Sequence, residues 1–133
     1  MKYMLMMQAT AKQWQAFGGW PEADLHAHVG FMMKLNTELK ASGELIDAQG
    51  LTTPDQAQVI RATGTGAPAV TDGPFPESKE FLAGYWIVDL RSHERMLELV
   101  AFISAAPGRG GLPMNMPIEV RPIGEAPKGE PCA

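Results

Sequence analysis

The stretch EFLAGYWIVDL, residues 80–90, decides how the rest of the chain can be arranged. It contains six large apolar side chains before Asp89, which is its only charge after the first residue. A strand of this composition is typical of one buried on both faces. We therefore expect residues 80–90 to form a central strand of a sheet.

Weaker patterns on both sides of this segment predict the other strands. Apolar or alternating runs predict strands at residues 2–8, 44–51, 57–63 and 118–121, with a short extended piece at 69–71. Asp72-Gly73, between that piece and the central strand, is a strong turn signal. The sheet is thus expected to be built from short strands around residues 80–90.

Two helices are expected, and both have clear boundary signals. Pro21 opens the first, which runs to about Ala41 and ends at Gly43. Ser92 caps the second, which runs to about Ala105. Each helix has one apolar face. Residues 13–20, which contain three aromatic residues and two glycines, are expected to form a loop.

The resulting order is β-α-β-β-β-α-β, in which two helices cover one face of an antiparallel sheet. This α+β arrangement is ferredoxin-like. The strands are apolar enough that the other sheet face needs a partner. A second copy is the simplest one, giving a homodimer in which the sheets pack face to face. Residues 1–124 are expected to form this single domain, and residues 125–133 a frayed tail.

Composition and charge exclude several classes of protein. The net charge is −4, and the 11 Lys and Arg residues form no basic cluster. This pattern argues against direct binding to nucleic acid or to an anionic membrane. The apolar start of the chain is too short for a signal peptide or a membrane span. Cys132 is the only cysteine, so we expect a cytoplasmic protein without a disulfide or a cysteine-based zinc site.

One long segment carries a family resemblance. TDGPFPESKEFLAGYWIV, residues 71–88, resembles the DGPF branch of the YCII-related family, and the motif with its strand is specific. KYML at residues 2–5, AAP at 105–107 and IEVRP at 118–122 are similar to that family as well. The resemblance covers nearly the whole chain.

The resemblance implies a fold, a chemistry and a partner. The family fold is the dimeric α/β barrel. A few relatives act on small organic acids, and members of this branch are often encoded beside extracytoplasmic-function sigma factors. A His and an Asp facing one cleft are the proposed active pair of the wider family. Asp72 matches the motif residue. His28 is our choice for the histidine because it lies on the apolar face of the first helix.

Each candidate catalytic residue also has a plain structural interpretation. Asp72 could serve as an acid or base, or it could simply belong to a turn. His28 could move protons near neutral pH, or it could be a core histidine. His26 and His28 point about 200° apart on a helix, so they cannot share a metal ion. No metal site is therefore predicted.

Several further residues are candidates for ligand binding. They surround the motif, the central strand and the aromatic segment: Gly73, Pro74, Phe75, Tyr85, Trp86 and Trp20. Core packing is the alternative for Tyr85 and Trp86, whose side chains should point to opposite faces of the strand. Trp14, Phe17 and Trp20 could form a lid over a cleft or a hydrophobic clasp.

Three functions follow from these patterns. The first is a cofactor-independent enzyme, a lyase, isomerase or hydrolase, that uses Asp72 and His28 as acid and base on a small organic molecule. The second is a non-catalytic ligand-binding or regulatory module associated with a sigma factor. The third is a dimer that binds an apolar ligand. The glycine-rich segments lack the residues of a nucleotide phosphate site.

Overall fold

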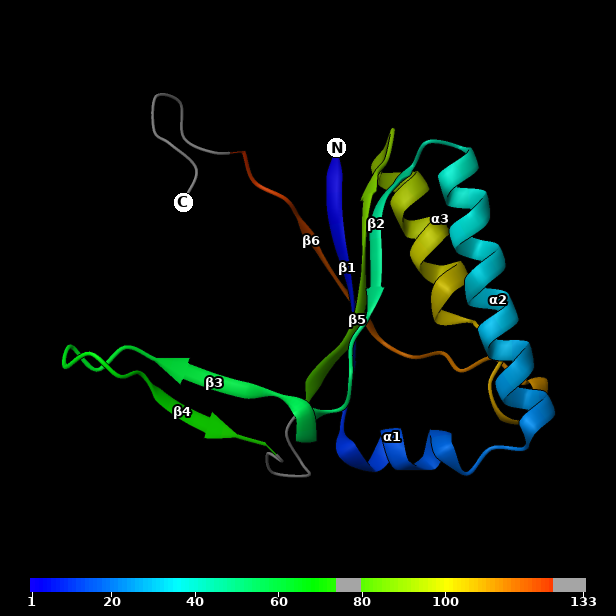
Figure 1. The fold of residues 1–133 in the computed structure, drawn as a ribbon. Coiled ribbons are helices and arrows are strands. Elements are labelled where there is room, and N and C mark those ends of the chain that lie inside the picture. The colour runs from blue at the N-terminus through cyan, green and yellow to red at the C-terminus, as the bar shows by residue number, and fades with distance from the viewer. Residues whose placement is uncertain (74–79, 126–133) are drawn as a thin grey trace.

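The computed structural model describes residues 1–73 and 80–125 (Figure 1). A four-stranded antiparallel sheet in the order β2-β5-β1-β6 forms its centre. The strands are β1 (Lys2–Ala9), β2 (Leu45–Gly50), β5 (Phe81–Asp89) and β6 (Ile118–Pro122). The apolar stretch that predicted a central strand forms β5, which lies between β1 and β2. That prediction is confirmed.

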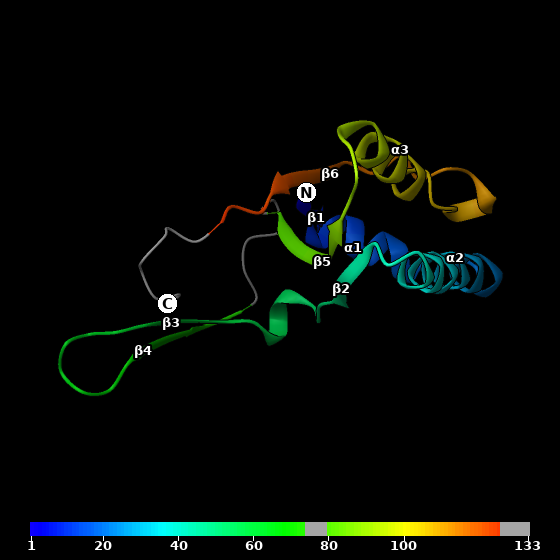
Figure 2. The ribbon, with the colours of Figure 1, turned by 90° about the horizontal axis from the view of Figure 1, so that it is seen from above.

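Two helices cover one face of the sheet, as expected (Figures 1 and 2). They are α2 (Glu22–Ala41) and α3 (His93–Ser104). Ser92 caps α3 by accepting a hydrogen bond from the Arg95 amide at 3.1 Å. Gly43 follows α2 with a φ of 79°, a conformation that favours glycine. The helix boundaries therefore lie at the residues that were predicted to form them.

The core lies between this sheet face and the two helices. Leu5 pairs with Trp86 in the register of β1 and β5, and Tyr3 pairs with Val88. Alternation along the strands points these four side chains toward the helices. The buried apolar cluster comprises Tyr3, Leu5, Leu35, Leu39, Trp86, Val88, Leu90, Met96, Leu99 and Ile103. Together these features give the expected α+β, ferredoxin-like domain. None of the described helices combines the length and apolarity needed to cross a bilayer.

The aromatic segment differs from the prediction. Residues 13–20 were expected to form a loop, but α1 (Ala11–Gly18) is a helix. Thr10 and Gln13 form a reciprocal capping box: the Gln13 side chain accepts from the Thr10 amide at 2.8 Å, and the Thr10 hydroxyl accepts from the Gln13 amide at 3.3 Å. The Thr-x-x-Gln spacing was the sequence signal that the loop prediction missed.

The hairpin is a second difference. β3 (Gln58–Arg61) and β4 (Ala69–Asp72) pair with each other as a separate two-stranded sheet, which projects away from the side covered by the helices (Figures 1 and 2). The chain reverses between them, where Gly64 and Gly66 have φ of 77° and 100°. Because these glycines readily adopt positive φ, they allow the chain to reverse between β3 and β4.

Gly73 is required by a close approach of two backbone segments. Its amide donates to the Ala57 carbonyl at 3.0 Å, and a Cβ atom at this position would overlap the carbonyl oxygen of Pro54. Pro54 begins the short helix η1 (Pro54–Gln56). The glycine of the motif thus fixes the base of the hairpin against η1.

We expect Gly73→Ala to weaken this junction by roughly 1–3 kcal/mol, because the backbone must shift to admit the methyl group. Hydrogen exchange of the β3 and β4 amides should accelerate, and thermal unfolding should begin earlier. Gly30→Ala in α2 is the matched control. A Cβ there meets no atom within 4 Å, so this change should stabilise the helix. Equal effects of the two changes would contradict the close-approach explanation.

Candidate functional site

His28 is the starting point of the candidate site. It lies in α2 and is the only buried polar side chain among the described residues, with an exposed fraction of 7%. Its Nδ1 lies 3.0 Å from the carbonyl oxygen of Pro107. A carbonyl oxygen only accepts hydrogen bonds, so Nδ1 must carry the hydrogen. In the neutral imidazole, the lone pair is then on Nε2, which can accept a proton.

Two aromatic rings pack edge-on against this imidazole. Phe17 lies 5.4 Å from it and Trp20 lies 5.9 Å from it, measured between ring centroids. Phe17 and Trp20 are themselves 4.5 Å apart. The structure therefore brings together two predicted site residues, His28 and Trp20, and adds Phe17 to them.

The aromatic contacts continue along α1 to the central strand. Trp14 stacks on Phe17 at 5.8 Å, and it also meets Phe81 edge-on at 6.1 Å. Phe81 is the first residue of β5. A row of aromatic rings thus connects the start of β5 to His28. Because the rings pack on one another, the structure supports the clasp interpretation of Trp14, Phe17 and Trp20.

The second ring nitrogen of His28, Nε2, makes no hydrogen bond with the described residues. No buried side-chain nitrogen or oxygen in the described part of the chain lacks a hydrogen-bond partner. The described residues offer Nε2 no such partner, since the only bond of this ring is made by Nδ1. Nε2 therefore keeps its lone pair free of hydrogen bonds within the described part of the chain.

The loop that holds His28 is itself fixed to α2. Gly108 donates to the Leu112 carbonyl at 2.7 Å, and Gly110 donates to the Asp24 carboxylate at 2.9 Å. The loop includes the short helix η2 (Arg109–Gly111). A Cβ at Gly108 would crowd the side chain of Met114 at 2.8 Å. These contacts keep the Pro107 carbonyl in place beside the imidazole.

A small pocket lies between α2 and the edge of the sheet. Its volume is about 170 Å³. It is lined by Met7, Met32, Asn36, Ala48, Gln49, Gly50, Gly84, Tyr85 and Trp86. Met32 is one helical turn beyond His28, so the two lie on the same side of α2. The indole Nε1 of Trp86 donates to Oδ1 of Asn36 at 2.9 Å, which leaves the amide hydrogens of Asn36 for another acceptor.

Tyr85 and Trp86 point to opposite faces of the sheet, as expected. Trp86 is buried against α2, whereas the Tyr85 hydroxyl donates to Oδ2 of Asp47 at 3.1 Å on the other face. This bond raises the pKa of Tyr85, because the carboxylate favours the protonated phenol. Trp86 can thus contribute its side chain to the pocket beside α2, and the Tyr85 ring belongs to the open sheet face.

Asp72 and His28 are not brought together within one chain. Asp72 ends β4 and is exposed, and its Oδ1 accepts from the Gln58 side chain at 2.9 Å. The hairpin and the beginning of α2 lie at opposite ends of α1 (Figure 1). The expected pairing of this carboxylate with the imidazole is therefore corrected: Pro107 supplies the His28 partner. Pro74 and Phe75 lie outside the described residues.

The acidic and histidine side chains do not form a metal cluster in the described part of the chain. No three His, Cys, Asp or Glu residues converge there as a metal site would require. The most distinctive chemical group among the described residues is the His28 imidazole, together with the Pro107 carbonyl that orients it and the aromatic rings beside it.

Comparison with known families is consistent with the fold and the sequence motif. The family described as "YCII-related domain" matches residues 1–110, which include the helices, the hairpin, β5 and the loop that contacts His28. No curated protein matches the chain. The match extends over most of the 133 residues. The chain belongs to the YCII-related domain family.

Proposed function

We propose that this protein is an enzyme that moves a proton on a small organic molecule without a cofactor, with His28 as the base. The main support is the hydrogen bond from His28 Nδ1 to the Pro107 carbonyl, because it leaves Nε2 as the basic nitrogen. The edges of Phe17 and Trp20 give the substrate an apolar contact beside it. A lyase or isomerase acting on a small organic acid fits this arrangement.

In this proposal, Asp72 is not the partner of His28. Its carboxylate is bound to Gln58 and stands off from α2, so the proton transfer does not depend on an intrachain dyad. We also propose that the protein belongs to the DGPF branch, as the motif at residues 72–75 indicates. Gly73 and the hairpin base then serve to set the position of the motif, and Trp20 and Trp86 contribute apolar surface.

The experiment is a screen of small organic acids for proton exchange, elimination or isomerisation by NMR. His28→Gln should reduce turnover by about 10²-fold or more, the usual contribution of a general base. His93→Gln is the matched control, because His93 is exposed at the start of α3. Turnover that survives in folded His28→Gln protein would refute the assignment.

The proposal includes a homodimer formed through the open sheet faces. Met4, Met6 and Ile87 alternate with core residues, so their side chains lie on the face that the helices leave uncovered. The projecting hairpin also exposes Val59, and Ile60 is exposed over 62% of its surface. An isolated two-stranded hairpin is marginal in water, so a second copy that covers both surfaces explains these side chains.

We expect sedimentation to give about twice the monomer mass of 14.4 kDa. Ile60→Glu should shift the protein toward the monomer, because it places a charge in the proposed interface. Leu112→Glu is the control, since Leu112 is equally exposed but lies near η2, away from the hairpin. A monomeric wild type, or equal effects of both changes, would contradict this interface.

A second candidate is a ligand-binding or regulatory module that associates with an extracytoplasmic-function sigma factor. The observation in its favour is exposed apolar surface on the helices, away from the open sheet face: Val29, Met33, Leu97 and Phe102. Binding to such a sigma factor should be lost in Met33→Glu protein and kept in His28→Gln protein. For turnover, the enzyme proposal predicts the reverse: loss in His28→Gln protein and retention in Met33→Glu protein.

A further inference from the structure

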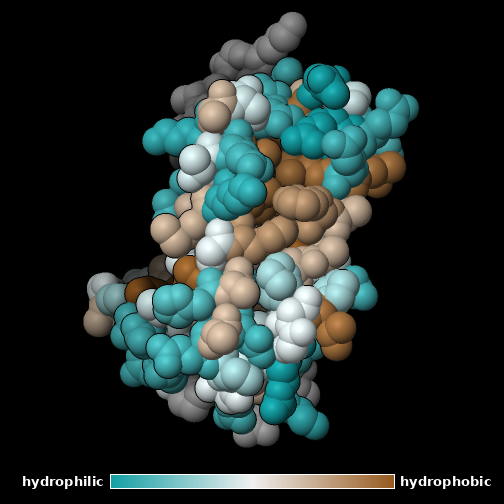
Figure 3. Space-filling view, turned by 90° about the vertical axis from the view of Figure 1, so that its right-hand side faces the viewer, coloured by the Kyte–Doolittle hydropathy of each residue, from teal (hydrophilic) through white to brown (hydrophobic). Residues whose placement is uncertain are grey.

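A second pocket lies between α2 and α3, on the side of the molecule opposite the open sheet face (Figure 3). Its volume is about 410 Å³, within the range of small-molecule sites. It is lined by Leu35, Glu38, Leu39, Ser42, Glu44, Arg95, Glu98, Leu99 and Phe102. None of these residues belongs to the His28 site, so the pocket is independent of the proton transfer proposed for His28.

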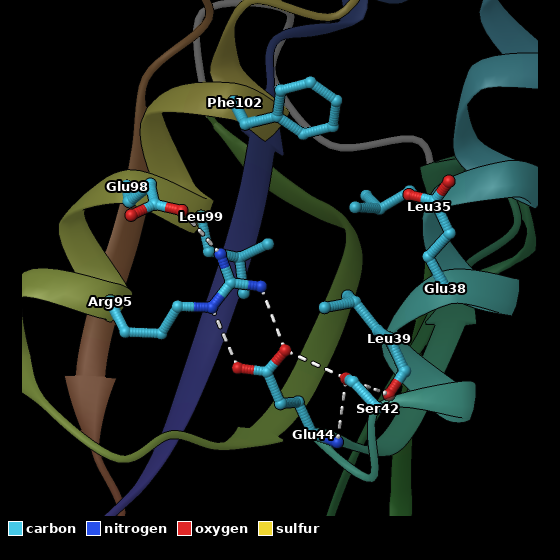
Figure 4. Close-up of a pocket in the computed structure, with 9 residues that line it drawn as sticks. All are labelled: Leu35, Glu38, Leu39, Ser42, Glu44, Arg95, Glu98, Leu99 and Phe102. Carbon is cyan, nitrogen blue, oxygen red and sulfur yellow. Dashed lines mark hydrogen bonds and ion pairs between the residues drawn. The ribbon is translucent and has the colours of Figure 1, made fainter.

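The floor of this pocket is apolar. Leu35 and Leu39 of α2 and Leu99 of α3 are buried members of the core cluster. Phe102 is 52% exposed, and its ring points from α3 into the space between the helices (Figure 4). Figure 3 shows the corresponding hollow lined by brown and tan side chains. The apolar part of a ligand bound here would cover the side chains of these leucine and phenylalanine residues.

Side-chain contacts bridge the two helices near both ends of the pocket. At one end, Phe31 of α2 and Phe102 of α3 bridge the helices with ring centroids 5.0 Å apart. At the other end, Glu44 and Arg95 form a two-bond ion pair. A partner helix needs a groove that continues along its length. These two bridges interrupt the groove and favour a small molecule as the occupant.

The charge around the pocket is negative, and its one cation is already neutralised. Arg95 donates from Nε and Nη2 to the two Glu44 oxygens, each at 2.9 Å, and from Nη1 to Glu98 at 3.0 Å (Figure 4). The Arg95 guanidinium holds the pKa of Glu44 below its ordinary value, so this carboxylate stays ionised. Three carboxylates and one guanidinium line the pocket, which gives it a net charge of −2.

Two of these carboxylates are placed to meet a cation. Glu38 projects from α2 and Glu98 projects from α3, on either side of the space below the Phe102 ring (Figure 4). Glu38 has only a loose pair with Lys34 at 4.0 Å, and both of those side chains are largely exposed. An aromatic face next to carboxylates attracts an organic cation. An anion would meet repulsion, because three carboxylates outnumber the single guanidinium of Arg95.

We propose that the pocket between α2 and α3 binds a small organic cation, an amine with an apolar body. The apolar body lies on Leu35, Leu39 and Leu99. The ammonium group lies between Glu38 and Glu98, against the ring of Phe102.

The test compares three probes of nearly equal size: 2-phenylethylammonium, neutral 2-phenylethanol and anionic 3-phenylpropanoate. Chemical shifts of the protein amides are followed during each titration. The ammonium probe should bind with a Kd on the order of 0.1–1 mM, as expected for a contact of this size. The neutral probe should bind at least about 5-fold more weakly, and the anion more weakly still.

Substitutions at exposed residues test the site without destabilising the fold. Glu38→Gln and Glu98→Gln should each weaken binding of the ammonium probe by about 2–5-fold, and Phe102→Ala by a similar factor. Glu119→Gln on β6 is the control for charge, and Leu97→Ala, elsewhere on α3, is the control for apolar surface. Both controls should bind as the wild type does.

Three results would overturn the proposal. One is equal affinity for the cationic, neutral and anionic probes. Another is unchanged affinity in the Glu38→Gln and Glu98→Gln variants. The third is the absence of shifts at the pocket residues up to about 10 mM ammonium probe, well above the Kd expected. None of these results affects the proposal for His28, since His28 and the aromatic rings beside it do not line this pocket.

Discussion

Replacing Trp86 with alanine is expected to reduce the free energy of unfolding by about 3–5 kcal/mol. The indole lies in the core between β5 and α2, and its Nε1 donates to Asn36 at 2.9 Å. The substitution leaves a cavity next to the small pocket between α2 and the sheet, and it removes the partner of Asn36. Urea unfolding monitored by circular dichroism measures the loss.

Trp86→Phe separates packing from hydrogen bonding. It keeps an aromatic ring in the core but leaves Oδ1 of Asn36 without its donor, which should cost about 1–3 kcal/mol. In the Asn36→Leu background, the same change should cost less, because no acceptor is left unpaired. A Trp86→Ala variant as stable as the wild type would show that this indole does not hold α2 against the sheet.

The second large effect concerns the ion pair between Arg95 and Glu44. Arg95→Met should reduce the free energy of unfolding by roughly 1.5–3 kcal/mol near neutral pH, because Glu44 loses two charge-assisted hydrogen bonds. The side chains are only 22% and 19% exposed, so water replaces these bonds incompletely. Lys34→Met, which removes the cation of an exposed pair at 4.0 Å, should change stability by less than about 1 kcal/mol.

The effect of Arg95→Met should depend on pH. In the folded protein the pKa of Glu44 is lowered from its ordinary value of 4.5. The stabilisation is therefore fully present above pH 4.5 and is lost as the pH falls through the lower, folded-state pKa. The difference between wild type and Arg95→Met should shrink below pH 4.5. A difference that stays constant in acid would mean that Arg95 stabilises the fold by packing alone.

Much of the fold could be predicted because its signals are local. The composition of residues 80–90 predicted a central strand, and β5 has that position. Pro21, Gly43 and Ser92 predicted the helix boundaries, since each acts on the backbone next to it. The inward position of His28 followed from the helical repeat and is confirmed by its burial.

The predictions failed where several local signals competed. The aromatic residues and glycines of residues 13–20 favoured a loop, but the capping box at Thr10 and Gln13 starts a helix there. The separate pairing of β3 and β4 through the reversal at Gly64 and Gly66 was not predicted either. Gly73 also lies against Pro54, a contact between residues 19 positions apart that local sequence signals do not reveal.

The site depended even more on contacts between distant residues. Asp72 and His28 were paired by resemblance, but the hairpin keeps Asp72 beside Gln58. The partner of His28 is a backbone carbonyl 79 residues away, which side-chain patterns cannot reveal. Likewise, Glu38 and Glu98 are ordinary surface residues in the sequence, and they line one pocket only because α2 and α3 lie side by side on the sheet.

The sequence by itself therefore determined the YCII-related family, the central position of residues 80–90 and the faces of the two long helices. These features depend on side-chain hydrophobicity and on backbone preferences that act over a few residues. Only the tertiary structure decided the partner of His28, the separation of Asp72 from it and the pocket between the helices. Those features depend on which surfaces meet after the chain has folded.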